Sequence, residues 1–186
     1  RELGISHRDV LPFSTGVIGR PLPMDKIRAG LRGIRGELKP DNLKRAAEAI
    51  MTTDKYPKYV SCRVGPAVIA GIAKGAGMIE PDMATMLVYL VTDAELPGAS
   101  LRPMLKRVVD RTFNCMSIDT DTSTSDTVVL MANGLAGNVN LREFESGLLQ
   151  VCVVEHDRGV LAAQLQADLL VGLVERGLAD APAGRV

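Results

Sequence analysis

A nearly continuous apolar run, Thr85 to Thr92 (TMLVYLVT), most constrains how this chain can fold. Its length suits a β-strand, and an apolar run of that length is typical of a strand buried on both faces. Such a strand needs helices or other layers packed on each side of its sheet. We therefore expect a helix-covered sheet in which Thr85 opens a buried strand and is held in a fixed position.

The rest of the chain alternates between strand and helix patterns. Tyr59 to Val64 and Ala67 to Ala73 are rich in β-branched residues and are separated by Gly65-Pro66, which predicts a hairpin. Apolar residues at helical spacing and a short apolar run predict the remaining elements: helices over Pro23 to Arg35, Asp41 to Met51 and Ser100 to Phe113 with Ser100 as N-cap, a helix from Leu141, and strands over Val10 to Phe13 and Val128 to Ala132. The fold class predicted is α/β (α+β), a layered sandwich with helices covering mixed β-sheets.

Charge and cysteine content exclude several classes of partner. Lys plus Arg and Asp plus Glu number 22 each, so neither nucleic acid nor an anionic membrane surface is expected. No apolar run is long enough to span a bilayer. Three scattered cysteines and two histidines are too sparse for a zinc cluster, so we expect no metal and read the cysteines as reduced and buried. The odd cysteine count and the lack of a signal-peptide pattern favour the cytoplasm.

The segment Ala73 to Leu87 (AKGAGMIEPDMATML) carries the pattern closest to a catalytic site. A threonine hydroxyl becomes nucleophilic when a nearby base takes its proton, and a threonine at a newly created N-terminus can use its own α-amine. Cleavage between Ala84 and Thr85 would create that terminus. Lys74, beside the flexible Gly75 and Gly77, is suited to hold a carboxylate, although an exposed lysine is the commoner interpretation.

Three other polar segments allow both a structural and a functional interpretation. Ser14-Thr15-Gly16 is either the end of a strand or an oxyanion hole. Thr52-Thr53-Asp54 is most simply a turn after a helix, with substrate binding as the alternative. The acidic block from Asp119 to Asp126 does not fit a calcium loop, because its sixth position is Thr124 and its twelfth is Leu130.

Four motifs in order resemble the ornithine acetyltransferase family, the bifunctional glutamate N-acetyltransferases of arginine biosynthesis. They are STGVIG from Ser14, IMTTD from Ile50, KGAGMIEPDMATML from Lys74 and RTFNCMSIDTDTSTSDTVVLMANG from Arg111. The resemblance implies a self-processing enzyme of the N-terminal-nucleophile type, cleaved between Ala84 and Thr85 into α and β chains. On this resemblance Thr85 is the nucleophile, Thr15 and Gly16 form the oxyanion hole, and Thr52, Lys74 and Thr85 contact the acetylated amino acid.

The same resemblance implies the reaction and its partners. Thr85 takes the acetyl group of N2-acetylornithine as an ester, and glutamate then accepts it to give N-acetylglutamate. No cofactor is implied, although some family members also use acetyl-CoA as a donor. The processed α and β chains are expected to pair as a heterodimer and to assemble further as a heterotetramer in the cytoplasm.

The resemblance also sets the expected organisation of the chain. We expect residues 1–186 to be a fragment of a single catalytic fold, with residues 1–84 in the α chain and 85–186 in the β chain. The match to the family fades after about Val151, so residues 152–186 are expected to be a divergent tail. Two alternatives stay open: a related self-processing aminopeptidase that passes the acyl group to water, and a non-catalytic or truncated remnant of the family.

Overall fold

A mixed sheet organises the fold of the chain in a computed structural model, which describes residues 2–16, 19–52, 54, 56–75, 86–115 and 125–160, the last seven by their backbone alone. Within these residues the sheet has four strands in the order β1-β2-β3-β4. β1 (Lys58–Val64), β2 (Ala67–Lys74) and β3 (Leu87–Glu95) are antiparallel neighbours, and β3 runs parallel to β4 (Thr127–Asn138). The β3–β4 crossover contains α3 (Gly98–Arg111), because parallel neighbours cannot be joined by a tight turn.

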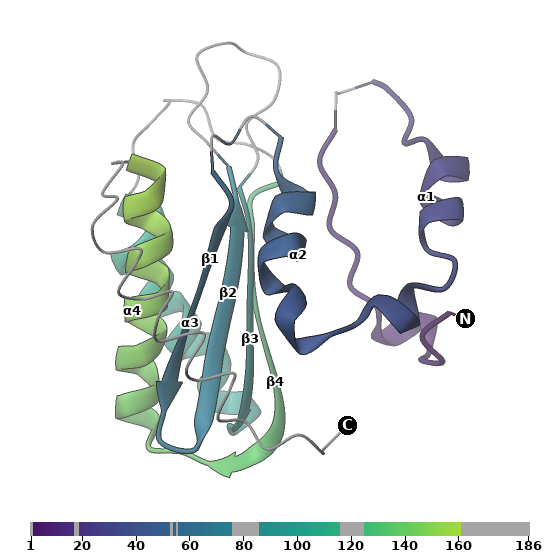
Figure 1. Cartoon of the computed structure of the whole chain (residues 1–186). Coiled ribbons are helices and arrows are strands. Elements are labelled where there is room, and N and C mark those ends of the chain that lie inside the picture. The colour runs from purple at the N-terminus through teal and green to yellow at the C-terminus, as the bar shows by residue number, and fades with distance from the viewer. Residues whose placement is uncertain are drawn as a thin grey trace.

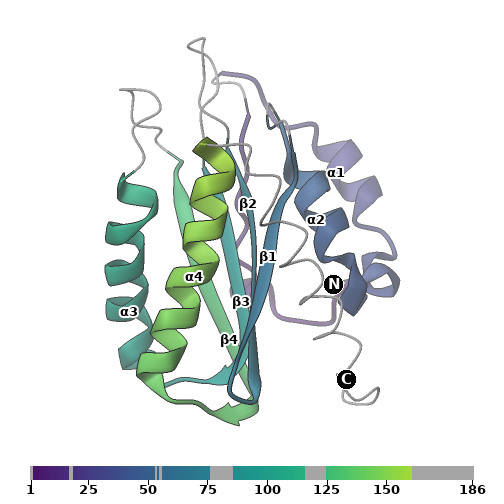
Figure 2. The ribbon, with the colours of Figure 1, turned by 60° about the vertical axis from the view of Figure 1, so that its left-hand side comes forward.

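Helices lie on both faces of this sheet. α3 and α4 (Leu141–Val160) cover one face, and α2 (Leu43–Ile50) lies on the other, alongside β1 and β2 (Figures 1 and 2). The main core lies between the sheet and the α3/α4 layer and includes Val60, Ile69, Leu90, Val108, Phe144, Leu148 and Val151. The predicted layered α/β architecture is confirmed.

Several predicted elements have their expected position. The hairpin forms across Gly65, which has a φ of 57° and so occupies the left-handed region that favours glycine. The helix predicted from Asp41 is α2, preceded by a short 3-10 turn over Pro40–Asn42. The helix predicted from Leu141 is α4, and it continues past Val151.

The strand predicted to be buried on both faces is buried on one. Leu90 is 0% exposed on the α3/α4 side, whereas Val91 on the opposite side is 40% exposed. The apolar run of β3 therefore does not indicate a complete helical layer on the second face of the sheet. α2 packs on that face over β1 and β2 and not over β3. Thr85 and Ala84 lie outside the described residues.

Other predicted boundaries were wrong. α3 begins at Gly98 with Pro97 at its N-cap, so Ser100 lies inside the helix. Residues 10–13 form no strand, because they pair with no neighbouring strand. The helix predicted over Pro23 to Arg35 is shorter, α1 (Met24–Gly30), and is followed by a 3-10 turn over Ile34–Glu37. Of the cysteines, which form no disulfide, Cys152 is buried but Cys62 is half-buried and Cys115 is exposed.

The N-terminal segment lies beyond α2, on the side of the sheet opposite α3 and α4 (Figure 2). Its elements, from the 3-10 turn at His7–Asp9 to α1, contain no buried residue. The segment reaches the sheet through Phe13, whose ring meets that of Tyr89 on β3 edge to face with centroids 5.7 Å apart. Among the described residues, no helix has the length and apolar character that crossing a bilayer requires.

Candidate functional site

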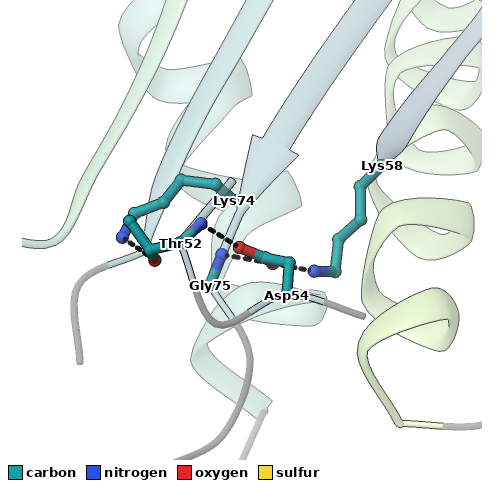
Figure 3. Close-up of polar contacts among 5 residues, drawn as sticks. All are labelled: Thr52, Asp54, Lys58, Lys74 and Gly75. Carbon is teal, nitrogen blue, oxygen red and sulfur yellow. Dashed lines mark hydrogen bonds and ion pairs between the residues drawn. The ribbon is translucent and has the colours of Figure 1, made fainter. Parts of the chain in front are cut away.

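The strand directions bring four chain segments to one end of the sheet. Lys58 opens β1 opposite Ala73, and Lys74 closes β2 opposite Leu87, which opens β3. Leu87 in turn lies opposite Thr127, the first residue of β4. The turn that follows α2, with Thr52 and Asp54, reaches the same end (Figures 1 and 3). Polar residues far apart in sequence therefore share one location.

A buried carboxylate, Asp54, is the centre of this cluster (Figure 3). Its side chain is 0% exposed. One oxygen, Oδ1, accepts hydrogen bonds from the ammonium of Lys58 and from the backbone N–H of Gly75 at 2.9 Å. The other, Oδ2, accepts from the backbone N–H of Thr52 at 3.3 Å. A buried charge is tolerated when it is paired and hydrogen-bonded in this way.

Lys74 and Thr52, both predicted as substrate contacts, lie together in the same cluster. The Lys74 ammonium donates to the Thr52 hydroxyl Oγ1 at 3.3 Å. Lys74 is only 3% exposed, which excludes the interpretation of a solvated surface charge, whereas Thr52 is exposed. Among the described residues Lys74 forms no ion pair, so its charge faces a hydroxyl and not a carboxylate.

Burial, hydrogen bonds and neighbouring charges shift two pKa values in the cluster. Burial lowers the pKa of Lys74, and Lys58 acts in the same direction, while the carboxylates of Asp54 and Asp126 oppose both. Burial alone would raise the pKa of Asp54, but hydrogen bonds from Lys58, Gly75 and Thr52 hold it below its ordinary value. The cluster therefore contains a stable carboxylate and a lysine whose charge is incompletely compensated.

Thr85 lies outside the described residues, but the next residue, Met86, is well held. The backbone N–H of Met86 donates to Asp126 Oδ1 at 2.8 Å, and its carbonyl accepts from the N–H of Thr127 at 2.9 Å. Thr127 is the first residue of β4, and Asp126 immediately precedes it. The chain is thus fixed at the residue that follows the predicted nucleophile.

The predicted oxyanion-hole residues are not joined to this cluster. Thr15 is half-buried and Gly16 is exposed. Within the described residues, neither forms a hydrogen bond with Thr52, Lys74 or Met86. Their assignment rests on the motif and stays a prediction.

Three residues of the cluster were not identified from the sequence as site residues. Asp54 and Asp126 lie within the quoted motifs, but no local pattern distinguished them from capping or loop carboxylates. No sequence pattern indicated Lys58 as a site residue, because its role depends on the ion pair that it forms with Asp54 in the folded chain. A search of the described residues finds no group of three His, Cys, Asp or Glu side chains that could hold a metal ion.

The fold and site together define an α/β protein with a buried polar cluster, one carboxylate and two lysines, at one end of its sheet. Comparison with known proteins gives a family: the model of the ArgJ family matches residues 1–168. The chain belongs to the ArgJ family.

Similar proteins come from several bacteria. The chain is 52% identical over 152 residues to arginine biosynthesis bifunctional protein ArgJ 2 of Clostridium acetobutylicum, a match that covers 82% of this chain and 39% of the relative. It is 55% identical over 148 residues to glutamate N-acetyltransferase Oat2 of Streptomyces clavuligerus, covering 80% and 38%. It is 53% identical over 147 residues to ArgJ of Thermus thermophilus, covering 79% and 38%. The chain therefore spans about two fifths of the length of these relatives.

Proposed function

We propose that this chain is the central part of an acetyltransferase of arginine biosynthesis, which moves the acetyl group of N2-acetylornithine to glutamate. Membership of the ArgJ family supports the pathway, since the similar proteins are named for arginine biosynthesis and for glutamate N-acetyltransferase activity. The observation in the structure that carries the proposal is the buried Lys74 beside Thr52. Both substrates possess an α-carboxylate, which a lysine ammonium binds through charge-assisted hydrogen bonds.

The reaction proceeds in two transfers through Thr85. Cleavage of the Ala84–Thr85 bond frees the α-amine of Thr85, which takes the hydroxyl proton as Oγ attacks the acetyl carbonyl carbon. The carbon–nitrogen bond to ornithine breaks, and the ornithine amine leaves with that proton. The amine of glutamate then attacks the ester, forms N-acetylglutamate and regenerates the hydroxyl. Thr15 and Gly16 stabilise the oxyanion of each tetrahedral intermediate.

The wider assembly follows from the same proposal. The two chains produced by cleavage stay together as an αβ heterodimer and assemble further into a heterotetramer in the cytoplasm. No cofactor is implied, and acetyl-CoA is the candidate to test as a second acetyl donor. Asp126, the residue before β4, supports the chemistry by holding the Met86 amide, one residue beyond the nucleophile.

Mass spectrometry and an acetyl-transfer assay on the complete gene product test the proposal. We expect a break immediately before Thr85 and transfer of acetyl from N2-acetylornithine to glutamate. Thr85→Ala should abolish both, with a loss of transfer of at least about 10⁴-fold, as is usual when a nucleophile is removed. Thr85→Ser retains a hydroxyl and should keep measurable cleavage and transfer.

Two outcomes would contradict the proposal. Transfer that persists in Thr85→Ala would place the nucleophile elsewhere. A parent protein that melts cooperatively but stays intact and inactive would instead support a non-catalytic remnant, and acyl transfer only to water would support an aminopeptidase-like enzyme.

A further inference from the structure

The buried carboxylate of Asp54 joins three segments of the chain. Its donors are the backbone of Thr52 after α2, the ammonium of Lys58 at the start of β1 and the backbone of Gly75 after β2. Each donor belongs to a different segment of the chain. All three contacts are made at the end of the sheet that carries Lys74 (Figure 3). Loss of this carboxylate would release the turn and the strand end together.

The same carboxylate acts on Lys74 through Thr52. The backbone N–H of Thr52 is held by Asp54, and the Thr52 hydroxyl accepts from the Lys74 ammonium. Because two covalently linked groups of Thr52 are fixed at once, the position of the ammonium depends on Asp54 although the two residues share no hydrogen bond. Positioning through a supporting hydrogen bond is a usual requirement of binding sites.

Charge pairing within the cluster separates the two lysines. Both lysines are buried, Lys58 with a side chain 7% exposed and Lys74 at 3%. Asp54 forms its ion pair with Lys58. Lys58 is therefore compensated within the protein, while the compensation of Lys74 by described residues comes from carboxylates that do not contact it. An incoming carboxylate would complete the pairing.

We propose that Asp54 is a positioning residue for substrate recognition: it neutralises Lys58 and fixes Thr52, so that Lys74, which has no ion-pair partner among the described residues, is presented to the substrate α-carboxylate. The inference rests on the proposed function for the identity of the substrate. It assigns to Asp54 a contribution to carboxylate selectivity and not to acyl transfer itself.

The double variant Asp54→Leu/Lys58→Met tests this role without changing the net charge of the cluster. Affinities of N2-acetylornithine and of its α-carboxamide are measured by calorimetry on the complete gene product. We expect the parent to prefer the carboxylate by about tenfold or more, as one charge-assisted interaction allows. The double variant should lower that preference to less than about threefold, because a leucine side chain has no atom that can accept from the Thr52 amide.

A second variant keeps the inference falsifiable if the first one does not fold. Lys58→Met leaves Asp54 without its cation, so the carboxylate should turn toward Lys74 and compete with the substrate. The preference should again fall. A matched control is Lys106→Met/Asp110→Asn, which removes an exposed pair with the same four-residue separation on α3 and should leave the preference unchanged.

The outcomes separate this inference from the proposed function. An unchanged carboxylate preference in the folded double variant overturns the positioning role, as does an unchanged preference in Lys58→Met if the double variant does not fold. A parent that prefers the carboxylate but transfers no acetyl group contradicts the acetyltransferase reaction alone, and the binding data still decide the role of Asp54. A parent that does not distinguish the two ligands overturns the positioning role directly.

Discussion

Lys74 is placed where a lysine is costly for folding but useful for binding. Burial lowers its pKa from the ordinary value of 10.5, which means that the folded protein disfavours the charged form relative to the unfolded chain. A base with a depressed pKa contributes stability that increases as the pH rises from the folded toward the unfolded pKa. A residue retained at such a cost is a candidate for function.

Lys74→Met should separate stability from binding. We expect the free energy of unfolding at pH 7 to stay equal to that of the parent or to rise by about 0.5–2 kcal/mol, the range of common stabilising substitutions. The excess stability should shrink as the pH is raised toward 10.5, because the parent then gains stability that the variant does not. Denaturant titrations at several pH values measure this. A clear loss of stability at pH 7 would show that the ammonium is fully compensated in the folded state.

Cys62 and Cys115 should differ in thiol reactivity. Burial raises the pKa of Cys62 to about 11, and its Sγ donates to the Gly147 carbonyl at 3.6 Å. At pH 8 only about one in 1,000 Cys62 thiols would be ionised, and the thiolate is the reactive form. Cys115 is exposed and should be alkylated first by iodoacetamide. Peptide mapping with time measures the order, and equal rates would contradict it.

At the scale of elements, α4 approaches the sheet closely because it carries a glycine. A Cβ on Gly147 would lie 2.5 Å from Val64 Cγ2 and 3.3 Å from Cys62 Sγ, both on β1. Neither neighbour is the free end of a long side chain, so the helix or the strand would have to move.

Gly147→Ala should therefore destabilise the fold although alanine favours helix formation. Overpacking costs about 1–3 kcal/mol, and the 2.5 Å contact places this site toward the upper end; against a gain of about 1 kcal/mol in helix propensity, the net loss is up to about 2 kcal/mol. Gly98→Ala on α3 is the matched control, because nothing lies within 4 Å of its Cβ position, and it should be neutral or stabilising by up to about 1 kcal/mol. Chemical denaturation compares the two. Adding Val64→Ala to Gly147→Ala should recover part of the loss, and its failure to do so would locate the strain elsewhere.

How far the sequence predicts the fold differs between local and distant features. The β1–β2 hairpin followed from Gly65-Pro66 between β-branched runs, because its determinants are adjacent in the chain. The parallel pairing of β3 with β4 did not, since it depends on where α3 returns the chain. In the site, Lys74 and Thr52 came from motifs, whereas the pairing of Asp54 with Lys58 depends on a buried location that no local pattern encodes.

At the scale of the molecule, helices cover one face of the sheet more completely than the other. The face toward α3 and α4 contains the main core. On the other face, α2 lies over β1 and β2, and Val91 on β3 pairs in register with Met131 on β4, both about 40–45% exposed. Substitutions at neighbouring positions of one strand should therefore have very different effects, according to the face that each side chain occupies.

Leu90→Ala and Val91→Thr test this asymmetry within β3. Leu90 is fully buried, so its truncation should cost about 2–5 kcal/mol through lost burial and the cavity that remains. Val91→Thr keeps a β-branched shape on the open face and should change the free energy of unfolding by less than about 0.5 kcal/mol. Urea denaturation of this chain at several concentrations measures both. A loss above 1 kcal/mol for Val91→Thr that grows with protein concentration would mean that a second chain covers this face in solution.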